Sequence, residues 1–272
     1  MTADDAAFQE LTGLISRQVG VSLDAYKTKC LRRRIAVRMR ACGVHTFPDY
    51  GAVLRRSPEE YERLKDALTI NVTRFYRNPE TWDALRARFL PELWEARGGR
   101  IAAWSAGCSS GEEPYTIAMI VAALAELRGR ASWLERLTVD ATDIDRASLA
   151  HAEAGRYRRE AFQETPADFL VRYVEEAPDG LVVVPAIRRQ VRVRRFDLTR
   201  EEAPRAAYDL VMCRNVVIYF DRPTQERLFS AFVDALRPGG LLVLGKVETL
   251  LGPAREALEL ADARERIYRR AA

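Results

Sequence analysis

Residues 101–120, IAAWSAGCSSGEEPYTIAMI, constrain the fold more than any other part of the chain. They begin with a short apolar run, residues 101–106, which has the composition of a strand buried in a parallel sheet. The run enters a loop bounded by Gly107 and Gly111, and glycine lets a backbone turn sharply and approach a ligand closely. An apolar stretch of helical length then follows. This pattern predicts a strand, a ligand-binding loop and a helix within an α/β sheet.

The start of that helix indicates what the loop binds. Ser110 and Glu113 have the spacing of an S-x-x-E capping box, and Pro114 falls in the first turn, where a missing N–H group costs nothing. The loop lacks the G-x-G-x-x-G pattern of dinucleotide sites, so a pyrophosphate is the weaker interpretation. Two acidic residues, Glu112 and Glu113, also disfavour phosphate. They suit a cationic or hydroxyl-rich ligand such as S-adenosylmethionine.

Later strands supply polar residues at the same predicted edge of the sheet. Residues 137–142 are apolar enough for a second strand, which Asp143 ends, and a helix is expected to reach residue 154. A carboxylate at this place in a doubly wound sheet holds ribose hydroxyl groups. A strand that begins at Tyr208 has Arg214 and Asn215 at its C-terminal end, and an R-P-G-G turn precedes a further strand at 241–245. This order of elements resembles that of class I methyltransferases.

Five short motifs, in order and with sensible gaps, extend the resemblance to nearly the whole chain. They are NVTRFYR at residues 71–77, AGCSSGEEPY at 106–115, ATDID at 141–145, FDL at 196–198 and CRNVVIYFD at 213–221. Together they resemble the CheR-type glutamate O-methyltransferases, which modify the chemoreceptors of bacterial chemotaxis. Any one of these strings can recur by chance, whereas the ordered set is specific.

The resemblance implies a fold, a reaction and a set of site residues. The fold would be α/β, a class I Rossmann-like doubly wound sheet with an N-terminal all-helical domain and a small inserted antiparallel β-subdomain. The reaction would transfer a methyl group from S-adenosyl-L-methionine to receptor glutamates, leaving S-adenosyl-L-homocysteine. The expected catalytic residues are Arg77, which would orient the carboxylate, and Tyr219, which would shape the pocket. The expected cofactor-binding residues are Asn71, Thr73, Arg77, Gly107, Glu113, Asp143, Asp197, Leu198, Arg214 and Asn215.

Each of these assignments has a purely structural alternative. Glu113 and Asp143 are acceptable helix caps, because a capping carboxylate occupies much the same place as a ligand-binding one. Arg77 as a surface ion pair would contribute about 1 kcal/mol or less. Tyr219 would serve equally as an amphipathic core residue, and Asn71 would serve to organise a turn.

Composition is consistent with this interpretation and selects no function. With 272 residues, 48% of them hydrophobic, the chain can bury a sizeable core in one or two domains. The four cysteines form no C-x-x-C pair, and with only two histidines we expect no metal site. The acidic start lacks the pattern of a leader, and no apolar run approaches the roughly 20 residues that span a bilayer. We therefore expect a cytoplasmic monomer without a membrane anchor.

The net charge is only +4, so an electrostatic partner must meet a local patch. Residues 27–40, KTKCLRRRIAVRMR, contain seven basic residues and no acid, while apolar residues recur at helical spacing. Because the helix has no acid to pair with them, its arginines are expected to be unpaired and to bind an acidic partner. They are Arg32, Arg33, Arg34, Arg38 and Arg40. A solvated face is the plain alternative. No aromatic residues interleave the arginines, which disfavours nucleic acid, and the resemblance implies the cytoplasmic helical region of a chemoreceptor.

We expect a helical receptor-docking domain at residues 1–75 and a methyltransferase domain at 76–272. Predicted helices lie at 6–19, 26–41, 47–55 and 58–68, and a lead-in helix lies at 82–94. The antiparallel β-subdomain is expected at about 157–196, with a hairpin turn at Asp179-Gly180 and the alternating segment 191–196. In relatives this subdomain can grip a peptide at the receptor C-terminus. The loop at 175–180 is shorter here, so we do not expect that tether.

Two other classes of function remain as alternatives. A nucleic-acid or small-molecule methyltransferase would share the cofactor module, but residues 215–219 are NVVIY rather than the D/N-P-P-Y of amino-methylating enzymes. A sensor that binds the cofactor and docks on a partner would differ by its lack of turnover.

Overall fold

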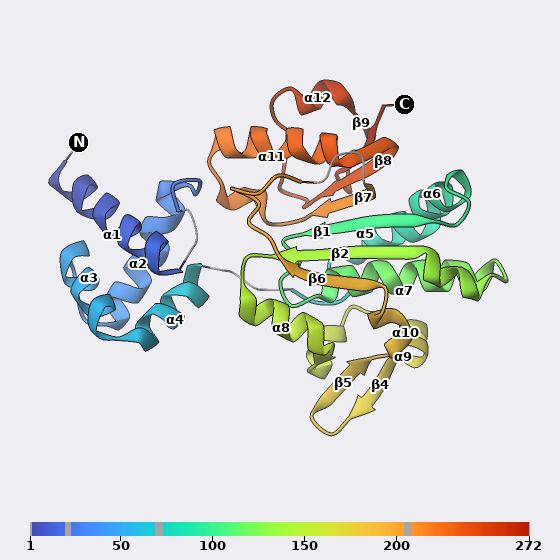
Figure 1. Ribbon diagram of the computed structural model, residues 1–272, viewed down its shortest axis with the longest axis horizontal. Helices are drawn as coiled ribbons and strands as arrows, with labels where there is room; N and C mark the ends of the chain where they lie inside the picture. The colour runs from blue at the N-terminus through green and yellow to red at the C-terminus, as the bar shows by residue number, and fades with distance from the viewer. Residues whose placement is uncertain (1, 20–22, 69–72, 204–207, 272) are drawn as a thin grey trace. The chain divides into compact units, whose positions relative to one another are not determined.

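The computed structural model describes residues 2–19, 23–68, 73–203 and 208–271. The chain divides into two compact units, Met1–Asn71 with Tyr219–Thr224, and Val72–Ile218 with Gln225–Ala272. We call them the helical unit and the sheet unit. Each has a hydrophobic core of its own. Figure 1 labels the helices of the first and the strands of the second.

The helical unit confirms the four predicted N-terminal helices. Leu31, Ile35 and Met39 form the apolar stripe of the basic helix, and all three are buried in the core of the unit. Burial of one stripe fixes which side chains of this helix face away from the core. The helices are α1 (Ala3–Val19), α2 (Thr28–Ala41), α3 (Phe47–Arg56) and α4 (Pro58–Leu68).

A short segment from much later in the chain completes the helical unit. The backbone amide of Lys27 donates a hydrogen bond to the carbonyl of Tyr219 at 2.9 Å, and the amide of Asp221 donates to the carbonyl of Ala25 at 2.9 Å. These bonds flank an antiparallel bridge between Tyr26 and Phe220. Segment 219–224 is therefore tied to the start of α2 by its backbone.

The sheet unit is built on a sheet whose described strands have the order β6-β2-β1-β7-β8-β10-β9. The strands from β6 to β8 are parallel, and β10 runs antiparallel between β8 and β9. The strands predicted from the apolar runs are confirmed. The strands are β1 (Ile101–Ala106), β2 (Leu137–Asp143), β6 (Val191–Arg195), β7 (Tyr208–Cys213), β8 (Leu236–Leu244), β9 (Leu258–Asp262) and β10 (Ile267–Arg270).

Helices cover both faces of this sheet (Figure 1). On one face lie α7 (Glu112–Leu127) and α8 (Arg146–Ala154), and Leu149 of α8 packs against Ala141 of β2. Trp104 of β1 is directed to the opposite face, where its ring centre lies 5.6 Å from that of Phe232 in α11 (Arg222–Ala235). The central strands are therefore buried on both sides, as a doubly wound fold requires.

The segment before β1 is helical but irregular. One helix was expected at 82–94, whereas α5 (Pro79–Ala84) passes into a π-helical turn, η1 (Leu85–Phe89), and then into α6 (Leu90–Ala96). Trp82, Phe89 and Trp94 are all buried in the core of the unit. A π-turn inserts an extra residue into a helix, so it changes which residues face that core.

A small antiparallel sheet has the order β3-β5-β4 and confirms the hairpin at Asp179-Gly180. The prediction that segment 191–196 belongs to this subdomain is wrong, because β6 pairs in parallel with β2. Val191 and Val193 pack against the cluster of Ala141 and Leu149, so the main sheet buries the apolar half of the alternation. The strands are β3 (Arg156–Tyr157), β4 (Val174–Ala177) and β5 (Gly180–Val183).

Short helical turns connect these elements. Among the described residues we find no helix with the length and apolar character needed to traverse a bilayer, and no cluster of acidic, histidine and cysteine side chains suited to a metal ion. The remaining elements are η2 (Ala131–Arg136), η3 (Arg159–Phe162), α9 (Ala167–Tyr173), α10 (Pro185–Arg188), η4 (Val217–Tyr219) and α12 (Ala254–Ala257).

Candidate active site

The loops that follow four parallel strands bring most of the predicted site residues to one edge of the sheet. Gly107 follows β1, Asp143 ends β2, Asp197 follows β6 and Arg214 follows β7. Because these strands run in the same direction, their C-terminal ends meet at the same edge. Ligands of open α/β sheets bind beyond that edge.

The glycine-bounded loop after β1 contacts its neighbours closely. Gly107 and Gly111 have positive φ angles of 83° and 96°, which L side chains rarely adopt. The Gly107 amide donates to the carbonyl of Thr142 at 2.8 Å. A Cβ atom at Gly107 would lie 2.5 Å from Cγ2 of Val216. The loop after β1 is therefore in direct contact with the end of β2 and with the loop after β7, and only glycine fits at position 107.

The predicted capping box at the start of α7 is wrong. The N-cap is a glycine, and the Ser110 hydroxyl donates to the carboxylate of Glu112 at 2.8 Å. The carboxylate of Glu113 accepts from the Ser105 hydroxyl at 2.8 Å and lies 3.6 Å from Nη1 of Arg214. These partners belong to β1 and to the loop after β7. Glu113 therefore faces the edge of the sheet and does not serve as a helix cap.

Arg214 connects the 71–77 motif to the start of α7. Its Nη2 donates to the carbonyl of Arg77 and to Oδ1 of Asn78, both at 2.9 Å, and its guanidinium lies over the ring of Trp82. Burial lowers the pKa of Arg214, although nearby Glu113 opposes the shift. Burial raises the pKa of Glu113, although Arg214 and Arg77 oppose that shift. The site thus contains a buried carboxylate whose charge is incompletely stabilised.

Arg77 is half-buried and lies between two residues of unusual backbone conformation. Tyr76 and Asn78 have φ angles of 58° and 62°. Such conformations cost roughly 1–3 kcal/mol in non-glycine residues and cluster at functional sites. Tyr76 is held by its amide, which donates to Oγ1 of Thr116 at 3.2 Å, and by its hydroxyl, which donates to Asp83 at 3.1 Å. This fixed backbone distinguishes Arg77 from an ordinary surface arginine.

Asp143 binds the loop after β1 with one oxygen and the loop after its own strand, β2, with the other. Oδ2 accepts from the Ser109 amide at 2.8 Å and Oδ1 from the Asp145 amide at 3.0 Å. Asp145 is the residue that caps α8, since it accepts from the amides of Ala147 and Ser148. Burial raises the pKa of Asp143 despite these hydrogen bonds. The amide of Ile144 also donates to this carboxylate, which has about four acceptor positions in all, so it can still accept from a ligand donor.

Asp197 presents an unsatisfied acceptor at the same edge. Its Oδ1 accepts from the amide and the hydroxyl of Thr199 at 2.8 and 2.6 Å. Its Oδ2 is buried and has no hydrogen-bond partner in the described part of the chain, with Arg200 Nε 4.0 Å away. Buried polar atoms are rarely left without a partner. Leu198 is half-buried beside it, and a hydroxyl-bearing ligand would satisfy the free oxygen.

Two buried carboxylates near these loops were not predicted as site residues. Burial raises the pKa of Glu112 to about 7, against hydrogen bonds from Ser110 and Thr73. Glu248 accepts the amide of Asn215 at 2.9 Å. The G-E-E sequence was a local signal for the first, whereas the second is 33 residues from its partner and has none. Asn71, another predicted cofactor residue, lies outside the described residues.

The prediction that the basic helix carries unpaired arginines is wrong for Arg32 and Arg38, which form ion pairs. Arg32 binds Asp4 at 2.6 Å and Asp5 at 2.8 Å. Arg38 binds both oxygens of Glu60, at 2.9 and 2.6 Å. The acids come from α1 and α4, so inspection of the helix alone could not reveal them.

A third arginine of the helix is buried rather than exposed, and it contacts a predicted catalytic residue. Arg34 is buried, donates to the carbonyl of Leu68 and lies with its guanidinium 4.5 Å from the ring centre of Tyr219. Tyr219 thus belongs to the helical unit and is half-buried there. Arg33 and Arg40 are exposed and form no ion pair with the residues that the structure describes.

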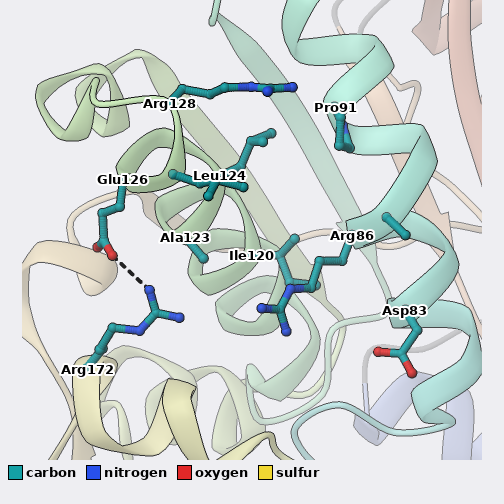
Figure 2. A pocket seen from close by; sticks show the side chains of 11 residues that line it. Asp83, Arg86, Pro91, Ile120, Ala123, Leu124, Glu126, Arg128 and Arg172 are labelled. Atoms are coloured by element: carbon teal, nitrogen blue, oxygen red, sulfur yellow. Dashed lines mark hydrogen bonds and ion pairs between the residues drawn. The ribbon is translucent and has the colours of Figure 1, made fainter.

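A separate cavity of about 720 Å³ lies in the sheet unit between η1, α6 and the C-terminal half of α7. Figure 2 shows that arginines from different elements, Arg86, Arg128 and Arg172, surround apolar side chains such as Ile120. Arg172 is already paired with Glu126, at 2.9 Å. None of the predicted cofactor residues lines this cavity, so it is distinct from the candidate site.

Two family models match the chain. The SAM-binding domain of the CheR methyltransferases matches residues 71–267, and their all-alpha domain matches residues 6–69. The chain belongs to the CheR methyltransferase family. It is therefore a methyltransferase that uses S-adenosylmethionine, and its sheet unit has the class I methyltransferase fold.

Curated relatives span most of the chain. The chemotaxis protein methyltransferase of Klebsiella aerogenes is 36% identical over 93% of this chain and 86% of its own length. That of Listeria monocytogenes is 33% identical over 89% of this chain and 90% of its own length. The probable biofilm formation methyltransferase WspC of Pseudomonas aeruginosa is 33% identical over 88% of this chain and 56% of its own length. These similarities confirm the resemblance inferred from the motifs.

Proposed function

We propose that this CheR-family methyltransferase methylates glutamate side chains of bacterial chemoreceptors, forming methyl esters and S-adenosyl-L-homocysteine. The observation that supports this most is the match of both domains to the family over nearly the whole chain. Relatives with similar coverage are named chemotaxis protein methyltransferases. The gathering of Arg77, Glu113 and Arg214 supports a site for charged reactants.

The acidic edge of the sheet fits the cofactor, which carries an ammonium group, a sulfonium group and two ribose hydroxyls. We assign Glu113 to the cationic part, because a buried carboxylate gains most from a cationic partner. We assign Asp143 to the ribose hydroxyls and the unpartnered oxygen of Asp197 to a further donor. The proposed site is completed by Asn71, Thr73, Arg77, Gly107, Leu198, Arg214 and Asn215.

The reaction requires the protein to position the reactants more than to transfer protons. The cofactor supplies a methyl group that is already activated by its bond to a sulfonium sulfur. A glutamate side chain has an ordinary pKa of about 4.3, so it is an ionised nucleophile at neutral pH. Alignment of reactants supplies roughly 7–11 kcal/mol. We assign Arg77 to orient the carboxylate, since a guanidinium matches its geometry, and Tyr219 to shape the methyl-transfer pocket.

We propose that the cytoplasmic helical region of the receptor docks on the basic helix α2. With Arg32 and Arg38 in ion pairs and Arg34 buried, the exposed positive charges of the helix are Lys29, Arg33 and Arg40. Exposed charges act mainly on encounter and are screened beyond about 8–10 Å at physiological salt. Methylation of the receptor should therefore weaken as salt rises.

We also propose that docking does not need a peptide at the receptor C-terminus. In the β4–β5 hairpin Ala177 pairs with Gly180, so the loop consists of Pro178 and Asp179 alone. A loop of this length has little surface with which to hold a peptide. A receptor C-terminal pentapeptide should therefore show no micromolar binding to the full chain in calorimetry, and such binding would refute this part of the proposal.

Methyl transfer from labelled cofactor to candidate receptor fragments tests the reaction. We expect label on the fragments, release of the label as methanol in mild base, and no label on fragments whose glutamates are replaced by alanine. Label on nucleic acid would support the alternative methyltransferase class. Cofactor binding without transfer to any protein fragment would support a sensor.

A further inference from the structure

Glu248 lies in the loop after β8, buried behind the loop that follows β7, and is 2% exposed. Its Oε2 accepts from the amides of Gly245 at 2.6 Å and Asn215 at 2.9 Å, and its Oε1 accepts from the amide of Ile218 at 3.4 Å. The amide of Val216 also donates to it. One carboxylate thus binds most of the amides in residues 215–218.

The two loops approach each other too closely for this contact to be incidental. Asn215 has a φ angle of 61°, in the left-handed region. A Cβ atom at Gly245 would lie 2.8 Å from Oε2 of Glu248 and 2.9 Å from the amide nitrogen of Asn215. Successive amides around a left-handed residue form a concave anion site. In this protein a carboxylate from the neighbouring strand end fills that site.

Backbone amides stabilise the charge of Glu248, since the described residues offer it no cation within ion-pair distance. Removal of the carboxylate therefore leaves buried amides without acceptors. Burial raises the pKa of Glu248 even though the amides oppose the shift. Its replacement by glutamine keeps the volume and one acceptor oxygen, but it turns an NH2 donor group toward backbone N–H donors on the other side.

The other side of the same loop faces the candidate site. Val216 packs against Gly107, and Arg214 contacts Arg77 and Glu113. We propose that Glu248 is a positioning residue for cofactor binding, which holds residues 214–218 so that Arg214 and Asn215 meet the cofactor. The inference deepens the proposed function, because it rests on the assignment of those two residues to the cofactor.

The test compares Glu248→Gln and Glu248→Asp with Asp209→Asn in the full chain. Asp209 is an equally buried carboxylate at the opposite end of β7, where it accepts from the amide of Ala102 and from Arg237. Calorimetry measures the affinity for S-adenosylhomocysteine, and thermal unfolding without ligand measures stability. We expect Glu248→Gln to weaken binding at least about tenfold and Glu248→Asp to weaken it less. Asp209→Asn should lower the unfolding temperature and leave the affinity unchanged.

Wild-type affinity in Glu248→Gln would overturn the inference. If that variant does not fold, Glu248→Asp decides: wild-type affinity in it, with a fall in unfolding temperature like that of Asp209→Asn, shows a merely structural role. Asn215→Ala separates the positioning role of Glu248 from the assignment of Asn215 to the cofactor. If Asn215→Ala weakens binding and the Glu248 variants do not, only the positioning role fails. If Asn215→Ala binds normally, the assignment of Asn215 to the cofactor, on which the inference rests, is wrong.

Discussion

Two buried carboxylates, one in each unit, have opposite electrostatic environments. Glu60 of the helical unit accepts two hydrogen bonds from Arg38 and one from the Tyr50 hydroxyl at 2.8 Å. Burial alone would raise the pKa of Glu60, but these partners lower it overall. For Glu113 of the sheet unit, burial outweighs the nearby arginines and the pKa rises.

The comparison shows how a carboxylate that stabilises the fold differs from one in a candidate binding site. Glu60 is stabilised by partners from the same unit, so its ionised form favours the fold. Glu113 pays a burial penalty that its protein partners do not fully offset. Buried acids with strongly shifted pKa values mark candidate functional sites, because a bound ligand can supply the charge stabilisation that the protein does not provide. A cationic cofactor fits that requirement.

The largest effect should come from breaking the structural pair. Arg38→Ala leaves Glu60 buried without its cation, and loss of one partner of such a pair costs about 3 kcal/mol of unfolding free energy. Urea unfolding measures the loss, and Arg33→Ala on the exposed side of the same helix should change stability little. Affinity for S-adenosylhomocysteine should remain at its wild-type value. A variant as stable as the wild type would show that the pair does not stabilise the helical unit.

The pH dependence of stability that comes from Glu112 should have the opposite sign to that from Glu60. The pKa of Glu112 is raised from 4.5 to about 7, so the folded protein binds this proton more tightly than the unfolded chain does. Its contribution to stability is complete below pH 4.5 and is lost as the pH rises to about 7. Over this range the wild type should therefore lose about 3 kcal/mol of unfolding free energy, and Glu112→Gln should not show this loss. Parallel stability profiles of the two proteins would contradict the raised pKa.

Removal of Asp143, the proposed ribose-binding carboxylate, should affect ligand binding more than the stability of the fold. Asp143→Ala deletes a charged acceptor, which typically costs roughly 1.5–3 kcal/mol of binding. We expect the affinity for S-adenosylmethionine to fall accordingly in calorimetry. The Ser109 amide also loses its acceptor, so Asp143→Asn serves as the variant that keeps one oxygen there. Unchanged affinity in both variants would remove Asp143 from the site.

Arg77 should affect turnover more than stability. Arg77→Lys keeps the charge but loses the planar fork of donors, while the backbone carbonyl that accepts from Arg214 is retained. Methylation should fall about tenfold, equal to about 1.4 kcal/mol of barrier, with a smaller change in cofactor affinity. Wild-type kcat in this variant would refute the role.

The smallest effect concerns the exposed arginines. Reversal of Arg33 and Arg40 to glutamate should raise the KM for receptor fragments about fivefold at physiological salt, without a change in cofactor affinity. The same reversal should have less effect at high salt, because the charges are then screened. Equal KM values at low salt would move the docking surface away from α2.

Local sequence patterns were sufficient to predict the helices and strands but not the partners of charged residues. The strand before Gly107 and the helix after Gly111 follow from apolar runs and glycine chemistry within twenty residues. The predicted cap failed because Glu113 accepts from Ser105 and also lies beside Arg214, which is 101 residues later in the chain. No window around α7 includes that arginine.

The same reason explains the errors elsewhere. Arg38 looked unpaired because its partner, Glu60, belongs to another helix. The alternation of β6 indicated a strand with one apolar face, but not which sheet would bury that face. Polarity and period are local properties, whereas ion pairs and strand order depend on how elements meet. The family resemblance supplied proposed site residues, such as Arg77, that local patterns do not indicate.

The brief return of segment 219–224 to the helical unit has a consequence for engineering. The chain passes between the units at residues 71–72, 218–219 and 224–225, so no single junction separates them. A chimera that takes only residues 1–71 from a relative would combine foreign helices with a native strip carrying Tyr219. Grafting of the complete helical unit therefore requires two pieces of sequence, residues 1–71 and 219–224.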